Sequence, residues 1–383
     1  MLNVLHINCN YTGNNLHKVM LSNFETFASD IVVFCPMGKY SEQQVDNLKK
    51  NEVITYCFDK WDKFFFFNKN RKIYRSLKES INDLERFNVI HAFTLYTDGY
   101  LAYRLHKKTK IPYVVAIRDT DVNTFFKYKP YLIPLGIRII KNAAAICFLS
   151  TTYRDYVIKK IVPEKYRAEI NNKCIVVPNG IDNYWFDHVY TNRNIKKAKE
   201  KIDNRNISVV CVGAISKRKN IPMVQQAIDI LRKKGWSINL NFIGKIEDIS
   251  EYNKLRLDKY NAHVQPVNKE KLIEFYRDAD IFVLVSHTET FGLVYAEALS
   301  QSLPVIYTHN QGFDGQFAEG EVGYSVNEND EMMIAEAIEK VCCNYEIITG
   351  NAIRGVNKFR WESICAVYQE LYEDIVDCAL TEI

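Results

Sequence analysis

The segment ETFGLVYAEALSQSLPVI (residues 289–306) decides the fold, because it connects two apolar strands through a turn and a helix. It follows the apolar run IFVLVS (281–286) and ends on PVI, where a second apolar run begins. Strands that alternate with helices are typical of parallel sheets covered by helices on both faces. We therefore expect Glu289 in the loop at the carboxyl end of a strand, and Glu297 about one and a half turns into the next helix.

The same alternation runs through the rest of the chain, with helical i, i+3/i+4 spacing between short apolar runs. It predicts an α/β protein with parallel sheets. The strand candidates are NVLHIN, DIVVFC, EVITYC, NVIHAF, YVVAI, AAICFLS and CIVVP in the first half, and ISVVCVG, INLNFIG, AHVQP, IFVLVS and PVIYT in the second.

A break near the middle separates the two halves. VPNGID (177–182) ends a strand in a turn, and a polar, basic stretch follows before the next strand. We expect two Rossmann-like domains that face each other across a cleft, with ligands at the carboxyl ends of the strands. The predicted boundaries are residues 1–184 and 185–362, followed by a helix over 363–383 that returns to the first domain.

A basic loop, VGAISKRKN (212–220), follows the first strand of the second half. Its glycine permits close backbone approach, and its three cations suit a polyanion such as a diphosphate. The alternative is a solvated basic loop. The first strand is followed by NCNYTGNN, with a single glycine at Gly13, so no GxGxxG dinucleotide fingerprint is present. No GxxxxGK[ST] phosphate loop is present either.

The two glutamates have both functional and structural interpretations. Glu289 could cap the helix, and Glu297 could be a surface residue of it. Together with the amides of Gly292 and Leu293 at the helix start and the basic loop of the neighbouring strand, they also form a constellation that can bind a sugar and an anion.

At this point the sequence resembles the retaining glycosyltransferases of the GT-B fold, in glycosyltransferase family 4. Their E-x7-E signature reads here as Glu289 to Glu297. Further similar segments occur in the family's order along nearly the whole chain: NVIHAF, IPYVVAIRD, AAAICFLSTTYRDYVI, VPNGID, VGAISKRKNI and FRWESICAVYQELYEDI.

The resemblance implies roles for individual residues. Glu297 would bind the ribose hydroxyls, and Glu289 would contact the donor sugar. Lys219 and Arg218 would stabilise the leaving diphosphate. The remaining donor contacts would come from the backbone of Phe291, Gly292 and Leu293 and from the loop at Gly13.

Three positions depart from the family pattern. Arg118 stands where a histidine is common, Ala214 where an arginine is common, and Gly315 where an acid is expected. Arg118 could still bind the sugar or an anionic acceptor, so we expect Arg118 and Asp119 on the acceptor side. No metal ion is expected, because we take the Asp-x-Asp match at Asp119 and Asp121 as accidental.

Composition excludes other classes. The net charge of +4 argues against a nucleic-acid partner, and the ten cysteines show no metal-ligand spacing. No apolar run is long enough to span a membrane. KWDKFFFFNKNRK (60–72) interleaves Trp61 and Phe64 to Phe67 with cations and precedes further cations at Arg75 and Lys78. It is either a peripheral membrane anchor or a plug in the core.

The sequence therefore predicts an enzyme of the cytoplasm, with a peripheral position on the inner face of the membrane as an option. It would transfer a sugar from a nucleoside diphosphate, with UDP favoured, to a glycan or lipid-linked saccharide in bacterial surface-glycan assembly. One alternative is a non-catalytic GT-B subunit that binds a partner glycosyltransferase or a glycan. Another is a nucleotide-sugar epimerase or a sugar phosphorylase on the same fold.

Overall fold

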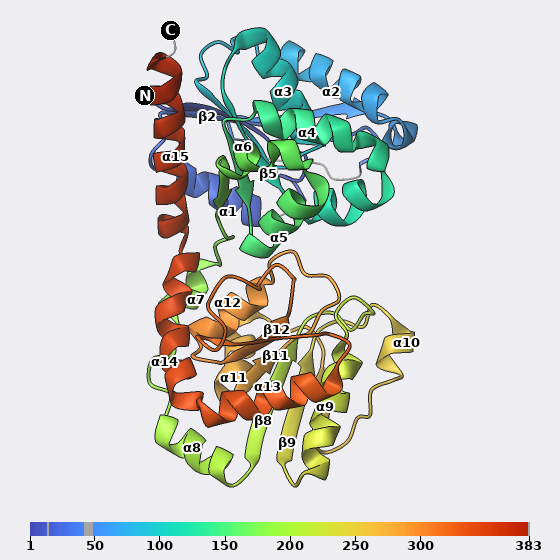
Figure 1. The fold of residues 1–383 in the computed structure, drawn as a ribbon, viewed down its shortest axis with the longest axis vertical. Coiled ribbons are helices and arrows are strands. Elements are labelled where there is room, and N and C mark those ends of the chain that lie inside the picture. Colours follow the sequence, from blue (N-terminus) through green and yellow to red (C-terminus); the bar gives the residue numbers. More distant parts are fainter. Residues whose placement is uncertain (14, 42–48, 382–383) are drawn as a thin grey trace. The chain divides into compact units, whose positions relative to one another are not determined.

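A computed structural model describes residues 1–13, 15–41 and 49–381 of the 383-residue chain (Figure 1). The chain divides into two compact units. Unit 1 comprises residues 1–149, 153–178 and 361–383, and unit 2 comprises residues 150–152 and 179–360.

Within its described residues, unit 1 has a seven-stranded sheet in the order β3-β2-β1-β4-β5-β6-β7, and every neighbouring pair is parallel. The strands are β1 Asn3–Ile7, β2 Asp30–Gly38, β3 Glu52–Phe58, β4 Val89–Ala92, β5 Tyr113–Ile117, β6 Ala145–Phe148 and β7 Cys174–Val176. The α-helices are α1 Asn15–Phe24, α2 Phe66–Ser80, α3 Thr97–Thr109, α4 Ile133–Asn142, α5 Thr151–Tyr156, α6 Arg167–Asn171 and α15 Trp361–Thr381.

Unit 2, taken by itself, has a six-stranded parallel sheet among the described residues, in the order β10-β9-β8-β11-β12-β13. The strands are β8 Asn206–Val212, β9 Ser237–Ile243, β10 Asn261–Val264, β11 Ile281–Val283, β12 Val305–Thr308 and β13 Gly323–Val326. The helices are α7 Asn183–Asp187, α8 Ile195–Asp203, α9 Ile221–Lys233, α10 Ile249–Tyr252, α11 Lys269–Asp278, α12 Leu293–Ser300, α13 Glu331–Cys343 and α14 Tyr345–Gly355.

The α/β prediction with parallel sheets is confirmed, and each of the twelve predicted strands overlaps an observed one. The structure adds β13, which the sequence did not predict. Its four residues GYSV contain a glycine and are only partly buried, because β13 lies at the edge of its sheet. A short edge strand of this kind lacks the apolar run that identifies a central parallel strand.

Unit 1 buries side chains on both faces of its sheet, as the alternation of strand residues requires. Leu5 and Ile7 of β1 join the cluster that α2, α3 and α4 cover, whereas Val4 joins a second cluster. That second cluster contains Phe24 of α1 and Trp361, Tyr368 and Tyr372 of α15. The C-terminal helix α15 is thus part of the core of unit 1 (Figure 1).

A search of the described helices finds no segment that combines the length and the apolar character needed to cross a bilayer.

Candidate active site

The candidate site of unit 2 is centred on a buried ion pair between two loops. One loop follows β8 and carries Lys219, and the other follows β11 and carries Glu289. Strands β8 and β11 pair in parallel, so both loops leave the sheet at the carboxyl edge. Lys219 Nζ lies 2.5 Å from Glu289 Oε2, and both side chains are buried. A pair this poorly hydrated holds both side chains in one geometry.

Other side chains on the two loops complete this cluster. Arg218 extends from the same loop as Lys219, is half-exposed, and places a guanidinium nitrogen 3.8 Å from Glu289 Oε2. Ser286 Oγ donates to the same carboxylate oxygen over 3.4 Å. Two cations therefore face one carboxylate, which leaves a positive charge for an incoming anion.

The backbone around Glu289 is fixed by a third loop, which follows β12. The Glu289 N–H donates to Gln311 Oε1 at 2.9 Å, and the Gly312 N–H donates to the Glu289 carbonyl at 2.8 Å. A Cβ at Gly312 would lie 1.9 Å from the Thr290 carbonyl oxygen, so only glycine fits there.

Asn220 fixes the loop that carries Lys219. It is buried, adopts a left-handed conformation with φ of 53°, and precedes α9. Its Nδ2 donates to the carbonyls of Glu328 (2.7 Å) and Val285 (3.3 Å). The sequence showed only a KN dipeptide here, because the two acceptors lie far along the chain.

Gly292 is the N-cap of α12, the helix that carries Glu297 and follows the loop of Glu289. This residue has φ of 77°, and a Cβ would lie 2.4 Å from the Tyr295 ring. The first turn of α12 directs backbone N–H donors outward at the positive end of the helix dipole. The Phe291 side chain packs into the core against Phe313 and Phe359, so Phe291 can offer only its backbone to a ligand.

Glu297 lies on α12 and accepts a hydrogen bond from the Tyr276 hydroxyl of α11 at 3.4 Å. Loss of hydration among the surrounding protein atoms raises the pKa of this carboxyl to about 7. The hydrogen bond from Tyr276 and the positive charge of Lys269 partly oppose this increase. Near neutral pH the carboxyl is therefore poised between its protonated and ionised forms. Neither the raised pKa of Glu297 nor its partner Tyr276 was predicted from the sequence.

The remaining predicted residues lie in unit 1, at the carboxyl ends of its strands. Gly13 follows β1 and lines a cavity of about 470 Å³ together with His17 of α1. Arg118 and Asp119 follow β5. Asp119 Oδ1 accepts from Asn123 Nδ2 at 2.6 Å and from the Tyr153 hydroxyl at 3.4 Å. Burial, followed by the positive charge of Arg118, lowers the pKa of His17 to about 4.

Two buried carboxylates that the sequence analysis did not assign connect the loops of unit 1. Asp98 accepts from the Cys9 N–H (3.2 Å) and from Thr94 Oγ1 (3.0 Å). Burial raises the pKa of Asp98 to about 7, although its hydrogen bonds from Thr94 and Cys9 oppose the shift. Asp98 therefore holds the loop after β1, which contains Gly13, against the start of α3.

Asp121 does the same for the loops after β4 and β5. Its carboxylate accepts from the backbone N–H groups of Arg118 (2.9 Å), Leu95 (3.0 Å) and Tyr96 (3.3 Å). Burial raises the pKa of Asp121 to about 6, against the effect of these hydrogen bonds. Because three backbone donors bind this carboxylate, its role is to hold the two loops together. Within the described ranges, no group of three or more His, Cys, Asp or Glu side chains could hold a metal ion.

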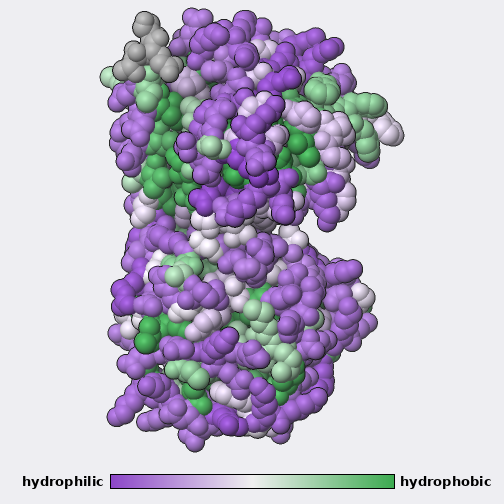
Figure 2. All heavy atoms as spheres, viewed as in Figure 1, coloured by the Kyte–Doolittle hydropathy of each residue, from purple (hydrophilic) through white to green (hydrophobic). Residues whose placement is uncertain are grey.

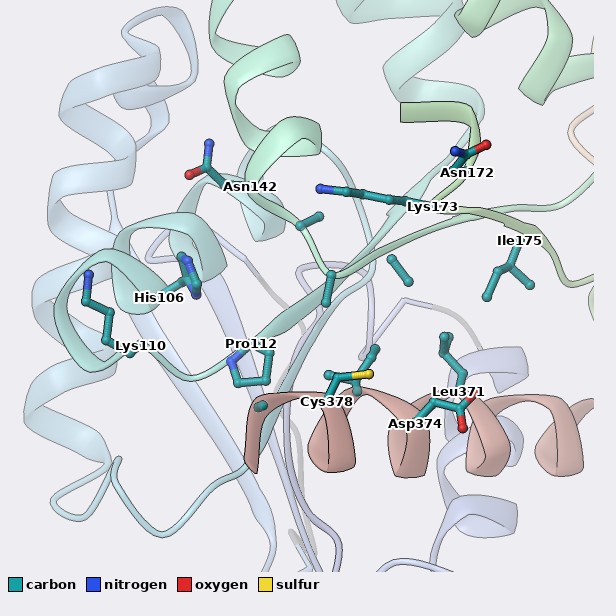
Figure 3. A pocket seen from close by; sticks show the side chains of 15 residues that line it. His106, Lys110, Pro112, Asn142, Asn172, Lys173, Ile175, Leu371, Asp374 and Cys378 are labelled. Atoms are coloured by element: carbon teal, nitrogen blue, oxygen red, sulfur yellow. The ribbon is translucent and has the colours of Figure 1, made fainter. Parts of the chain in front are cut away.

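A larger cavity, of about 560 Å³, lies elsewhere in unit 1 (Figure 3). Its lining includes Pro112, Ala144 and Lys173, which directly precede β5, β6 and β7, and it is closed on one side by Asp374 and Cys378 of α15. It is thus at the amino ends of the strands. Ligands of open parallel sheets bind at the opposite, carboxyl ends, so we do not assign the reaction to this cavity.

Both units match protein families. The family described as Glycosyltransferase Family 4 matches residues 28–183, and the family described as Glycosyl transferases group 1 matches residues 192–348. The fold agrees with solved structures of the same class. Sucrose-phosphate synthase from Thermosynechococcus elongatus superposes with a TM-score of 0.72 at 16% identity, covering 99% of this chain and 100% of the other. Anabaena HepE in complex with UDP and glucose superposes with a TM-score of 0.65 at 13% identity, covering 97% and 99%.

Sequence relatives carry glycosyl-transfer names as well. Alpha-monoglucosyldiacylglycerol synthase from Acholeplasma laidlawii is 27% identical over 310 residues, which is 76% of each chain. A probable sucrose-phosphate synthase from Thermosipho melanesiensis is 25% identical over 339 residues, or 80% of this chain and 76% of that one. The fold and the relatives define the class as GT-B glycosyltransferases. The chain belongs to glycosyltransferase family 4, and it is an enzyme of the glycosyltransferase type.

Proposed function

We propose that this glycosyltransferase moves a sugar from a nucleoside diphosphate to a glycan or a lipid-linked saccharide, retaining the anomeric configuration and using no metal ion. The observation that carries the proposal is the buried Lys219–Glu289 pair beside the first turn of α12, with Glu297 on the same helix. A cation from the loop after β8, and a carboxylate and outward-facing amides from the loop and helix after β11, suit a sugar attached to a diphosphate.

Each group then has a chemical role. The bond between the anomeric carbon and the diphosphate breaks, and the diphosphate gains negative charge. Lys219, Arg218 and the first amides of α12 are placed to stabilise that charge. Glu289 accepts hydrogen bonds from donor sugar hydroxyls, and Glu297 accepts them from the ribose. We assign Lys219 and Glu289 to catalysis, and the backbone of Phe291, Gly292 and Leu293 to donor binding.

Unit 1 supplies the acceptor side in this proposal. Arg118 and Asp119 would bind the acceptor, Arg118 would also assist the reaction, and the loop at Gly13 would approach the diphosphate. Metal independence is supported by the state of Asp121, whose carboxylate is occupied by three backbone N–H groups. The other acid of the Asp-x-Asp match, Asp119, accepts hydrogen bonds from Asn123 and from the Tyr153 hydroxyl, so both carboxylates of the match are engaged by the protein.

The choice of donor base and acceptor class rests on related proteins. HepE, of the same fold, was solved with UDP, so UDP-sugars are the donors that we propose first. The relatives include a glucosyldiacylglycerol synthase and a capsular polysaccharide biosynthesis glycosyltransferase of Staphylococcus aureus. These names support surface-glycan assembly and a lipid-linked acceptor, and with such an acceptor we propose a peripheral position on the inner face of the membrane.

The test is donor turnover with a panel of UDP-, GDP- and ADP-sugars, measured as released nucleoside diphosphate. We expect release from one donor, unaffected by EDTA, and at least a hundredfold loss in Glu289→Gln. Lys196→Gln, an exposed change in α8 of the same unit, is the matched control and should retain activity. Loss of activity in EDTA would overturn metal independence, and an inverted product anomer by NMR would overturn retention.

A further inference from the structure

The start of α2 in unit 1 presents a group of exposed aromatic side chains. Trp61, Phe64, Phe65 and Phe67 are 75%, 72%, 63% and 58% exposed, and we call these four residues the aromatic end. Figure 2 shows a hydrophobic area over this end of α2, at the edge of unit 1 where Figure 1 places it. Single exposed apolar side chains are common, but four within seven residues mark an interaction site.

The segment is held firmly in this exposed conformation. Phe66 is buried and packs between Tyr96, Tyr100 and Phe125, so one of the four phenylalanines joins the core while its neighbours face outward. Of the two alternatives for this stretch, the core plug therefore holds for Phe66, whereas the aromatic end stays exposed.

The acidic residues next to the aromatic end are neutralised. Asp62 accepts from Lys72 Nζ at 2.6 Å and from Asn68 Nδ2 at 2.7 Å, and Lys72 Nζ also lies 2.9 Å from Asp59 Oδ2. These contacts fix the short 3-10 helix η1 (Lys60–Phe64) to α2. Together with Lys39, whose Nζ lies 3.8 Å from Asp59 Oδ1, Lys72 balances the charge of the two carboxylates and so reduces their repulsion of an anionic surface.

A basic pocket continues from the aromatic end along the same helix. Arg71, Arg75 and Lys78 follow Phe67 at helical spacings of four, four and three residues, so the four residues share one face of α2. The three cations and Arg104 of α3, together with Tyr74 and Glu79, line a cavity of about 410 Å³. The Arg104 guanidinium lies 3.9 Å from the centre of the Tyr74 ring. Four cations and one acid make this a site for phosphate groups.

We propose that the aromatic end and the basic pocket together form a docking surface for an anionic phospholipid bilayer. The aromatic side chains enter the interfacial layer, and the cations of α2 and α3 bind lipid phosphates. Charge complementarity and the shared helix face favour a bilayer. The small net charge of the whole chain speaks against nucleic acid as the occupant.

Binding to vesicles tests this surface without any donor or acceptor, so its outcome is independent of the proposed reaction. We would sediment the full-length protein with vesicles of phosphatidylcholine alone and with about one third phosphatidylglycerol. We expect at least tenfold tighter binding to the anionic vesicles, weakened by 0.5 M salt. Trp61→Ser/Phe64→Ser should lower binding to both compositions by tenfold or more.

A second variant, Arg75→Gln/Lys78→Gln, should remove most of the preference for anionic vesicles, by roughly thirtyfold for two cations near the surface. Matched controls in unit 2 are Ile249→Ser/Ile347→Ser and Lys196→Gln/Lys197→Gln, which alter exposed residues of the same kinds and should leave binding unchanged. Unchanged melting temperatures would show that all variants fold. Vesicle binding that survives both α2 variants would overturn the proposal, even if nucleoside diphosphate release is intact.

Discussion

At the scale of single residues, the pair Lys219–Glu289 combines a structural and a chemical role. Both groups are buried and lie 2.5 Å apart, so removing one leaves the other charged and poorly hydrated. We expect Lys219→Met to lower the free energy of unfolding by roughly 3–5 kcal/mol, because an unpaired buried carboxylate is costly. Urea unfolding followed by circular dichroism measures this directly.

The double variant Lys219→Met/Glu289→Gln separates the two roles. It removes both charges, so much of the stability lost in the single variant should return, whereas donor turnover should stay lost. If the double variant is as unstable as the sum of the two single ones, the pair is not coupled in the way that its geometry indicates.

Glu297 should make nucleotide binding depend on pH. Burial raises its pKa to about 7, so the carboxylate form becomes dominant only as the pH rises above that value. Because ribose hydroxyls donate best to the ionised form, UDP affinity should increase severalfold between pH 6 and pH 8. Isothermal titration calorimetry at each pH measures this affinity. The same measurement on Glu297→Gln is the control, because it contains the effect of protonating UDP itself. Parallel pH profiles for the two proteins would contradict the role of Glu297.

At the scale of elements, twelve of the thirteen described strands followed from sequence, because most of them are short apolar runs. The two glutamates could be placed on a loop and a helix for the same reason. The pairing of Lys219 with Glu289 could not be derived, because 70 residues separate them and only the parallel β8–β11 pairing brings their loops together. The roles of Asn220 and Asp121 in holding loops could not be derived either, because most of their hydrogen-bond partners are backbone groups distant in sequence.

The loop that carries Glu289 depends on Gly312. An added Cβ would lie 1.9 Å from the Thr290 carbonyl oxygen, so Gly312→Ala must shift that loop. We expect a lower melting temperature and at least a tenfold loss of donor turnover. Gly350→Ala in α14 is the control, because a Cβ there meets nothing within 4 Å. Since alanine favours helices, the control should gain up to about 1 kcal/mol. Equal behaviour of the two variants would contradict this account.

Asp98, which joins the loop after β1 to α3, should shape the pH dependence of stability. Burial raises its pKa to about 7, well above the value of about 4 in an unfolded chain. The stability that its protonated form contributes is complete below pH 4 and is lost as the pH rises through 7. Asp98→Asn cannot ionise, so its free energy of unfolding should fall less between pH 4 and pH 8, by up to roughly 4 kcal/mol.

Chemical denaturation of both proteins across this pH range measures the difference. Asp121, with a pKa of about 6, adds a smaller effect of the same sign in both proteins, and its influence on the pKa of Asp98 is part of the measured difference. Identical pH profiles would show that Asp98 has the same pKa in the folded protein as in the unfolded chain.

At the scale of the whole molecule, the two units should differ in whether they can fold alone, because only one of them is nearly continuous in sequence. Unit 2 is formed almost entirely by the continuous segment 179–360, whereas unit 1 needs α15 from the far end of the chain. Without α15, the apolar cluster that contains Phe24 and Tyr372 would be open to water. We therefore expect residues 179–360 to fold alone in one cooperative transition, and residues 1–178 to aggregate.

Unit 1 should recover when α15 is returned to it. The two segments that connect the units run side by side, because the Ile181 N–H donates to the Phe359 carbonyl over 3.1 Å. A short glycine–serine linker from Pro178 to Trp361 should therefore produce a soluble, cooperatively unfolding unit 1. Calorimetry of the three chains tests this expectation, and UDP titration should show binding to 179–360, where Lys219, Glu289 and Glu297 all lie. A soluble 1–178 chain with the same melting temperature as the linked chain would show that α15 covers unit 1 without stabilising it.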